Sequence, residues 1–98
     1  MVEHLVVFQA KSGKEADVLA ALKDFAAEIK KELPGIETLN VGENFTKRSL
    51  DQGWTHGLYA RFRDRSVLEA YGPHPMHRAL LAKLADISDG ALPVDFEV

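Results

Sequence analysis

The chain has no cysteine, so disulfides, thiolate metal ligands and thiol nucleophiles are all excluded. It also has no apolar run that approaches the length of about 18 residues needed for a transmembrane helix. Basic residues are in the minority: 12 Lys and Arg stand against 15 Asp and Glu, a net charge of −3. Binding duplex nucleic acid or an anionic membrane requires a basic face, so neither partner is expected. The N-terminus lacks the basic start and cleavage site of a secretion signal, which favours a cytoplasmic protein.

The 98 residues provide one domain, residues 1–98. Residues 2–9 are rich in Val, Leu and Phe and predict a buried strand. Between residues 14 and 33 the apolar positions recur every three or four residues, as on one face of a helix. Pro34-Gly35 ends this helix, and residues 36–43 predict a second strand.

The second half of the chain predicts a strand, a helix in two pieces and a last strand. Residues 44–53 are a polar loop, and residues 54–63 alternate strictly between apolar and polar faces, as in a strand. A short helix is expected over residues 64–71, a longer one begins at Pro75, and residues 92–98 alternate as the last strand. On that last strand Asp95 and Glu97 are expected on the solvent or interface side.

The order β-α-β-β-α-β predicts an α+β, ferredoxin-like fold, in which a four-stranded antiparallel sheet carries its helices on one face. The two central strands are apolar on both sides, with Leu5 and Val7 on the face away from the helices. An open apolar sheet face favours association, and a two-fold homodimer with its sheets packed face to face is the simplest closed solution.

Several chemically active residues are expected in the layer between the sheet and the helices. On the third strand His56 shares a face with Leu58, and on the first strand His4, Val6 and Phe8 share the matching face. An inward histidine can also be a core residue whose nitrogen is bonded to a backbone carbonyl. The sequence leaves both interpretations open for His4 and His56.

The helical segments add two histidines and a tyrosine. His77 lies on the leucine stripe of the last helix. A buried ionisable group there needs either a hydrogen-bond partner or a role in function. His74 is three residues earlier, where it can instead cap the helix before Pro75. Tyr71 ends the preceding short helix, where it is either an amphipathic plug or a functional hydroxyl. All four histidines and Tyr71 can thus face one region.

A histidine and a tyrosine in an apolar pocket can act as a general base and a hydrogen-bond donor. This pair suits proton removal beside a carbonyl without a cofactor. Zinc is not favoured, because His74 and His77 are three rather than four residues apart and no adjacent carboxylate completes a site. No metal or cofactor is therefore expected. Phosphate-binding glycine loops and a serine nucleophile elbow are absent.

Three motifs resemble the stress-responsive α/β-barrel family, also called the dimeric A/B barrel or Dabb domain. They are His4-Leu5-Val6-Val7-Phe8, Gly53-Trp54-Thr55-His56 and Tyr71-Gly72-Pro73-His74-Pro75-Met76-His77, followed by Val94-Asp95-Phe96. The resemblance covers essentially the whole chain. It implies a ferredoxin-like protomer and a homodimer whose two sheets form an α/β barrel.

The resemblance also implies roles for single residues. Plant members that cyclise polyketides use a histidine base and a tyrosine partner, which correspond here to His77 and Tyr71, with His4 and His56 lining the cavity. Those cyclases carry bulky aromatic residues on the long helix, where this chain has Leu22, Lys23 and Ala26. Two functions fit: a cofactor-independent lyase, cyclase or isomerase acting on a small carbonyl compound, or a non-catalytic stress-associated homodimer or small-molecule binding module.

Overall fold

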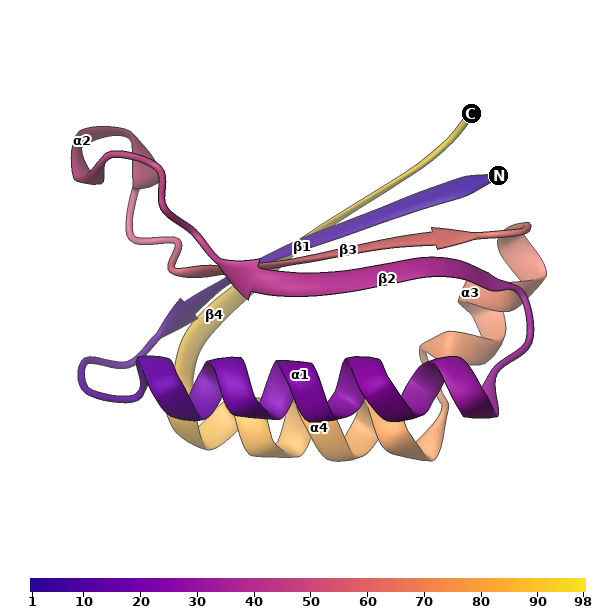
Figure 1. The fold of residues 1–98 in the computed structure, drawn as a ribbon, viewed down its shortest axis with the longest axis horizontal. Coiled ribbons are helices and arrows are strands. Elements are labelled where there is room, and N and C mark those ends of the chain that lie inside the picture. Colours follow the sequence, from indigo (N-terminus) through magenta and orange to yellow (C-terminus); the bar gives the residue numbers. More distant parts are fainter.

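The computed structural model describes all 98 residues and confirms the ferredoxin-like arrangement (Figure 1). The elements are β1 (Val2–Ala10), α1 (Glu15–Glu32), β2 (Ile36–Glu43), α2 (Arg48–Asp51), β3 (His56–Phe62), α3 (Arg65–Tyr71), α4 (Pro75–Ile87) and β4 (Ser88–Glu97). The sheet has the order β2-β3-β1-β4, and every neighbouring pair is antiparallel. Helices α1 and α4 lie side by side beneath one face of this sheet (Figure 1).

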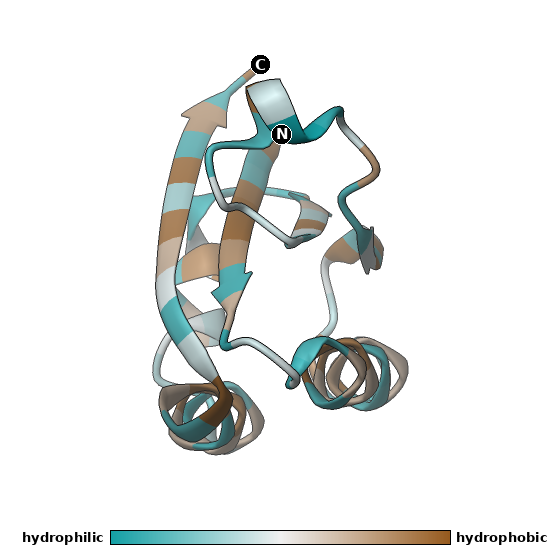
Figure 2. Ribbon diagram, turned by 90° about the vertical axis from the view of Figure 1, so that its left-hand side faces the viewer, coloured by the Kyte–Doolittle hydropathy of each residue, from teal (hydrophilic) through white to brown (hydrophobic).

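The alternation of β3 places its apolar side chains against the helices. His56, Leu58, Ala60 and Phe62 are buried, and the residues between them are only partly covered. Figure 2 shows similar alternation as hydropathy bands along the strands. The strand begins at His56 rather than Trp54, because the Trp54 N–H donates to the Asp51 carbonyl at 2.9 Å in the preceding turn.

The core fills the layer between the sheet and the two long helices. Helix α1 contributes its predicted apolar stripe, and α4 adds Leu80 and Leu84. The buried apolar residues are Val2, Phe8, Val18, Ala21, Leu22, Phe25, Ala26, Ile29, Leu39, Leu58, Ala60, Phe62, Val67, Tyr71, Leu80 and Leu84. No helix combines the length and the hydropathy that crossing a bilayer requires.

Two segments differ from the prediction. The loop over residues 44–53 contains the one-turn helix α2, which has no buried residue and therefore leaves no apolar stripe in the sequence. Strand β4 begins at Ser88 instead of Leu92, directly after α4. The Ser88 hydroxyl donates to the Leu84 carbonyl at 2.6 Å, and Ser88 pairs with Ala10 beyond an irregularity in the register.

Gly35 is required by the turn between α1 and β2. Its φ is +99°, and a Cβ at this position would lie 2.5 Å from Cγ2 of Val67. Both the backbone strain and the overlap oppose a side chain, so Gly35→Ala should lower the free energy of unfolding by about 1–3 kcal/mol. Urea denaturation measures the loss. Gly42→Ala is the matched control, because a Cβ there would have no atom within 4 Å and the φ of Gly42 is not positive. Equal stability of the two variants would contradict the prediction.

Candidate active site

A partly open cavity of about 180 Å³ lies between the sheet and α4. It is polar at one end, where two histidines and a tyrosine meet, and apolar elsewhere. Its lining consists of His4, Val6, Phe8, Leu58, Tyr71, His77, Leu80, Leu81, Ala91 and Pro93. The structure thus brings together six of the side chains singled out in the sequence. His56 and His74 are not among the lining residues.

Tyr71 presents an unpaired hydroxyl at this cavity. Its side chain comes from the last residue of α3, and only 2% of the residue is exposed. The hydroxyl makes no hydrogen bond within the chain and is not fully enclosed, and Tyr71 is one of the residues that line the cavity. Burial raises the pKa of Tyr71 well above its usual range, and the charge of Asp95 adds to this effect. The phenol therefore stays protonated and can donate a hydrogen bond.

His77 lies in the first turn of α4, and a backbone carbonyl sets the position of its proton. Its Nδ1 lies 2.9 Å from the Gly72 carbonyl oxygen, and a carbonyl can only accept, so Nδ1 carries the proton. Nε2 is left with a free lone pair. Burial lowers the pKa of His77 below its ordinary value, and the charges of His4 and His74 lower it further, against the opposing effect of the Gly72 hydrogen bond. The ring is therefore neutral at neutral pH, as a general base must be.

His4 has a carboxylate partner that the sequence pattern does not predict. Asp95 is solvent-exposed, as expected, with 40% of its side chain accessible, but it lies on the helix-facing side of β4, where its Oδ1 contacts Nδ1 of His4. The reason is register: His4 and Asp95 are directly paired on β1 and β4, so their side chains share a face. The carboxylate can only accept, which places the His4 proton on Nδ1 and leaves Nε2 free.

The rings around the cavity form one packed cluster with Tyr71 at its centre. Its ring centroid lies 4.7 Å from that of His77 and 5.3 Å from that of His4. Phe62 and Phe25 support Tyr71 from the core at 5.0 and 5.8 Å. The hydroxyl and the two imidazoles are therefore held at one end of the cavity by buried, rigid neighbours.

The remaining two histidines have other surroundings. His56 is 1% exposed, and its Nδ1 lies 2.7 Å from Oγ1 of Thr55, while its Nε2 is enclosed without a partner. It borders a separate, polar groove of about 280 Å³ that includes Glu15 and Glu43. His74 caps α4, because its Nδ1 accepts the Met76 N–H at 3.1 Å. The structure has no group of three or more histidine and acidic side chains placed to hold a metal ion.

Comparison with known proteins gives a family and a set of structural neighbours. No curated protein sequence matches the chain. A dimeric ferredoxin-like protein of unknown function from Jannaschia sp. CCS1 is 26% identical with a TM-score of 0.87, covering 99% of this chain and 98% of that one. A dimeric protein of unknown function and ferredoxin-like fold from Bacteroides fragilis is 24% identical with a TM-score of 0.83, with coverage of 99% and 95%.

An enzyme also shares the fold. The hydroxynitrile lyase from Passiflora edulis has a TM-score of 0.81 at 12% identity, with coverage of 99% of this chain and 92% of that one. At that identity the likeness concerns the fold alone. The family model described as the stress responsive A/B barrel domain matches residues 2–98. The chain therefore belongs to the stress responsive A/B barrel domain family.

Proposed function

We propose that the protein is a cofactor-independent acid/base enzyme that moves a proton at the carbon next to a carbonyl group. The observation that carries this proposal is the pairing of a free imidazole nitrogen on His77 with a free, protonated hydroxyl on Tyr71 at one end of an apolar cavity. The lyases, aldol cyclases and isomerases that react through an enolate use this elementary step.

In the proposed step Nε2 of His77 takes the proton from carbon. The electron pair of that C–H bond forms the enolate, whose oxygen accepts a hydrogen bond from the Tyr71 hydroxyl. The proton then returns from His77 to carbon, at the same or another position. The Gly72 carbonyl supports the reaction by holding the ring and stabilising the proton on Nδ1.

The size of the cavity defines a suitable probe. A cavity of about 150 Å³ is known to accommodate benzene, so a volume of about 180 Å³ accepts a ligand of six or seven heavy atoms. Cyclohexanone has this size and exchangeable protons beside its carbonyl. In D₂O at neutral pD the wild type should accelerate the exchange of these protons for deuterium, which proton NMR follows directly.

Two substitutions test the assigned roles. Because loss of a general base costs about 10²–10⁴ in rate, His77→Gln should remove most of the acceleration, and Tyr71→Phe should remove a smaller part. Arg78→Gln is the control, because Arg78 is an exposed residue of α4 that does not line the cavity. Binding of cyclohexanone without any exchange would instead support a non-catalytic binding module.

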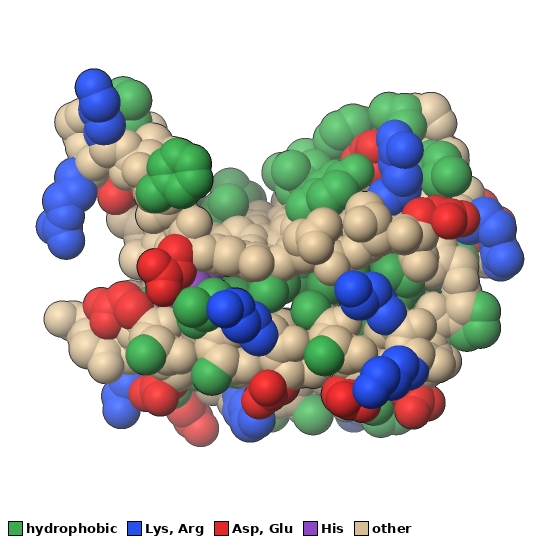
Figure 3. Space-filling view, viewed as in Figure 1, with side chains coloured by type: hydrophobic (Ala, Val, Ile, Leu, Met, Phe, Trp, Pro, Cys, Tyr) green, Lys and Arg blue, Asp and Glu red, His purple; other side chains and the backbone are tan.

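We also propose that the protein works as a homodimer through the sheet face that the helices leave open. Hydrophobic side chains gather on that side of the molecule (Figure 3). They include Leu5, Leu92, Val94 and Phe96, which are 39–51% exposed. On the same face Glu3 is paired with Arg61 at 2.8 Å and accepts from the Tyr59 hydroxyl, so its buried charge is already satisfied. The dimers described for the two ferredoxin-like neighbours support this assembly.

A further inference from the structure

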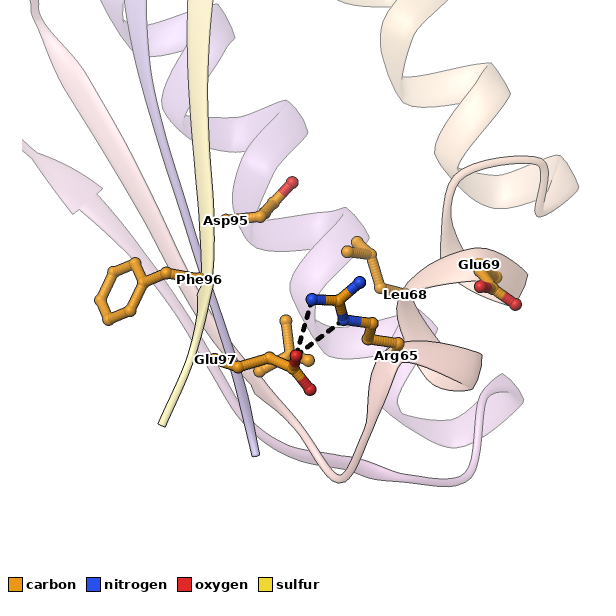
Figure 4. A pocket seen from close by; sticks show the side chains of 7 residues that line it. Arg65, Leu68, Glu69, Asp95, Phe96 and Glu97 are labelled. Carbon is orange, nitrogen blue, oxygen red and sulfur yellow. Dashed lines mark hydrogen bonds and ion pairs between the residues drawn. The ribbon is translucent and has the colours of Figure 1, made fainter.

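A second hollow, a groove of about 360 Å³, lies between α3 and β4 and has Asp95 in its lining (Figure 4). Its lining residues are Val2, Arg65, Leu68, Glu69, Asp95, Phe96 and Glu97. The Asp95 side chain is 40% exposed, whereas that of its partner His4 is 8% exposed. Asp95 therefore faces the groove, His4 faces the cavity, and one hydrogen bond joins them.

We propose that Asp95 and His4 form a proton relay between the solvent in the α3–β4 groove and the interior of the cavity. A proton released in the cavity binds Nε2 of His4, and the proton on Nδ1 passes to the Asp95 carboxylate and then to water. His4 is then left with its proton on Nε2. An inward transfer reverses each step, so one outward and one inward transfer restore the starting tautomer.

The basic side chain of the groove does not form an ion pair with Asp95. Arg65 is engaged by Glu97, with Nη2 and Nε lying 2.7 and 2.8 Å from Oε1 of that carboxylate (Figure 4). Glu69 of α3 is the remaining charged group of the groove lining. No lysine or arginine forms an ion pair with Asp95, so its partner is the His4 ring alone.

A relay supplies what the proposed acid/base reaction needs in a small apolar cavity. Substrate bound there restricts direct access of water to the two histidines. A reaction that takes up or releases a proton overall must still exchange that proton with the solvent. The catalytic use of the relay rests on the proposed function. The transfer through Asp95 and His4 is nevertheless a property of the free protein, and it is measured without substrate.

The test is the exchange of the His4 Nδ1 proton with water, followed by NMR on ¹⁵N-labelled protein. In the wild type this exchange should accelerate as acetate buffer is added, because acetate reaches Asp95 through the groove. Asparagine retains an oxygen that accepts from Nδ1 but has no basicity near neutral pH. Asp95→Asn should therefore slow the exchange by about tenfold or more while the His4 proton stays on Nδ1.

A second variant blocks the groove and leaves the carboxylate in place. Leu68→Trp adds bulk to the groove lining and should also slow the exchange at His4. The Nδ1 proton of His77, which is bonded to the Gly72 carbonyl, is the internal control and should not respond to either substitution. An exchange rate at His4 that is unchanged by Asp95→Asn would overturn the relay. Failure of the proposed function would appear separately, as absent cyclohexanone exchange in a wild type whose His4 still responds.

Discussion

A Val7→Asp variant is expected to be monomeric at protein concentrations where the wild type, by the proposed assembly, forms a dimer. Val7 lies near the middle of the open sheet face, where it pairs with Gly57 of β3 and Leu92 of β4. An aspartate there would be buried without a partner in the dimer, which costs about 3–5 kcal/mol. A two-fold interface contains the substitution twice, so the dissociation constant should rise by at least about a hundredfold. Sedimentation equilibrium measures this change.

The control for this experiment is Ala82→Asp. Ala82 is exposed on α4, on the opposite side of the sheet, so the same carboxylate there stays in water. This variant should remain a dimer with the wild-type dissociation constant. An intact Val7→Asp dimer would mean that the chains associate through another surface.

The fold could be predicted because its central elements are buried on regular faces. The strict alternation of β3 and the apolar stripe of α1 record burial directly, since most buried positions carry apolar side chains. The segments that differ lack that pattern. Helix α2 buries nothing, and the first residues of β4 include Ser88 and Gly90, whose place in the sheet depends on pairing with β1.

The candidate site is predictable where a side chain's direction follows from its own element. His4 and Leu58 lie on buried faces of their strands, and His77 lies on the inward stripe of its helix. The role of Asp95 depends instead on which residue of β1 stands beside it, and register between distant strands is not visible in the local pattern. Alternating hydrophobic residues at Val94 and Phe96 make Asp95 look like an ordinary outward residue. The signal that could have found it is a pairing of β1 with β4.

Position along a strand also explains why His56 lies outside the cavity. It shares the helix-facing side of β3 with Leu58, as the alternation predicts, but it lies opposite Phe8, whereas His4 lies opposite Ala60, four residues farther along β3. A strand advances about 3.3 Å per residue, so the two histidines are separated by about 13 Å along the sheet. Sharing a face does not place two residues in one cavity, because position along the strand also matters.

Phe62→Ala is expected to be strongly destabilising. Phe62 is fully buried, and its ring centroid lies 5.6 Å from that of His4 and 5.0 Å from that of Tyr71. Removing a buried phenylalanine ring costs about 3–5 kcal/mol, through lost burial and the cavity left behind. Because small domains have only about 5–15 kcal/mol of stability, urea denaturation should show a large fall in the midpoint.

The matched control is Phe45→Ala, since Phe45 is fully exposed and the same atoms are removed. Its free energy of unfolding should change by no more than about 0.5 kcal/mol when both variants are compared in the same oligomeric state. Phe62→Leu then separates packing from the ring itself: most of the volume returns, but the aromatic contacts with His4 and Tyr71 do not. If those contacts hold the two side chains in place, Phe62→Leu should regain stability while cyclohexanone exchange stays slow. Recovery of both would show that filling the space is sufficient, and equal stability of Phe62→Ala and Phe45→Ala would contradict the placement of Phe62 in the core.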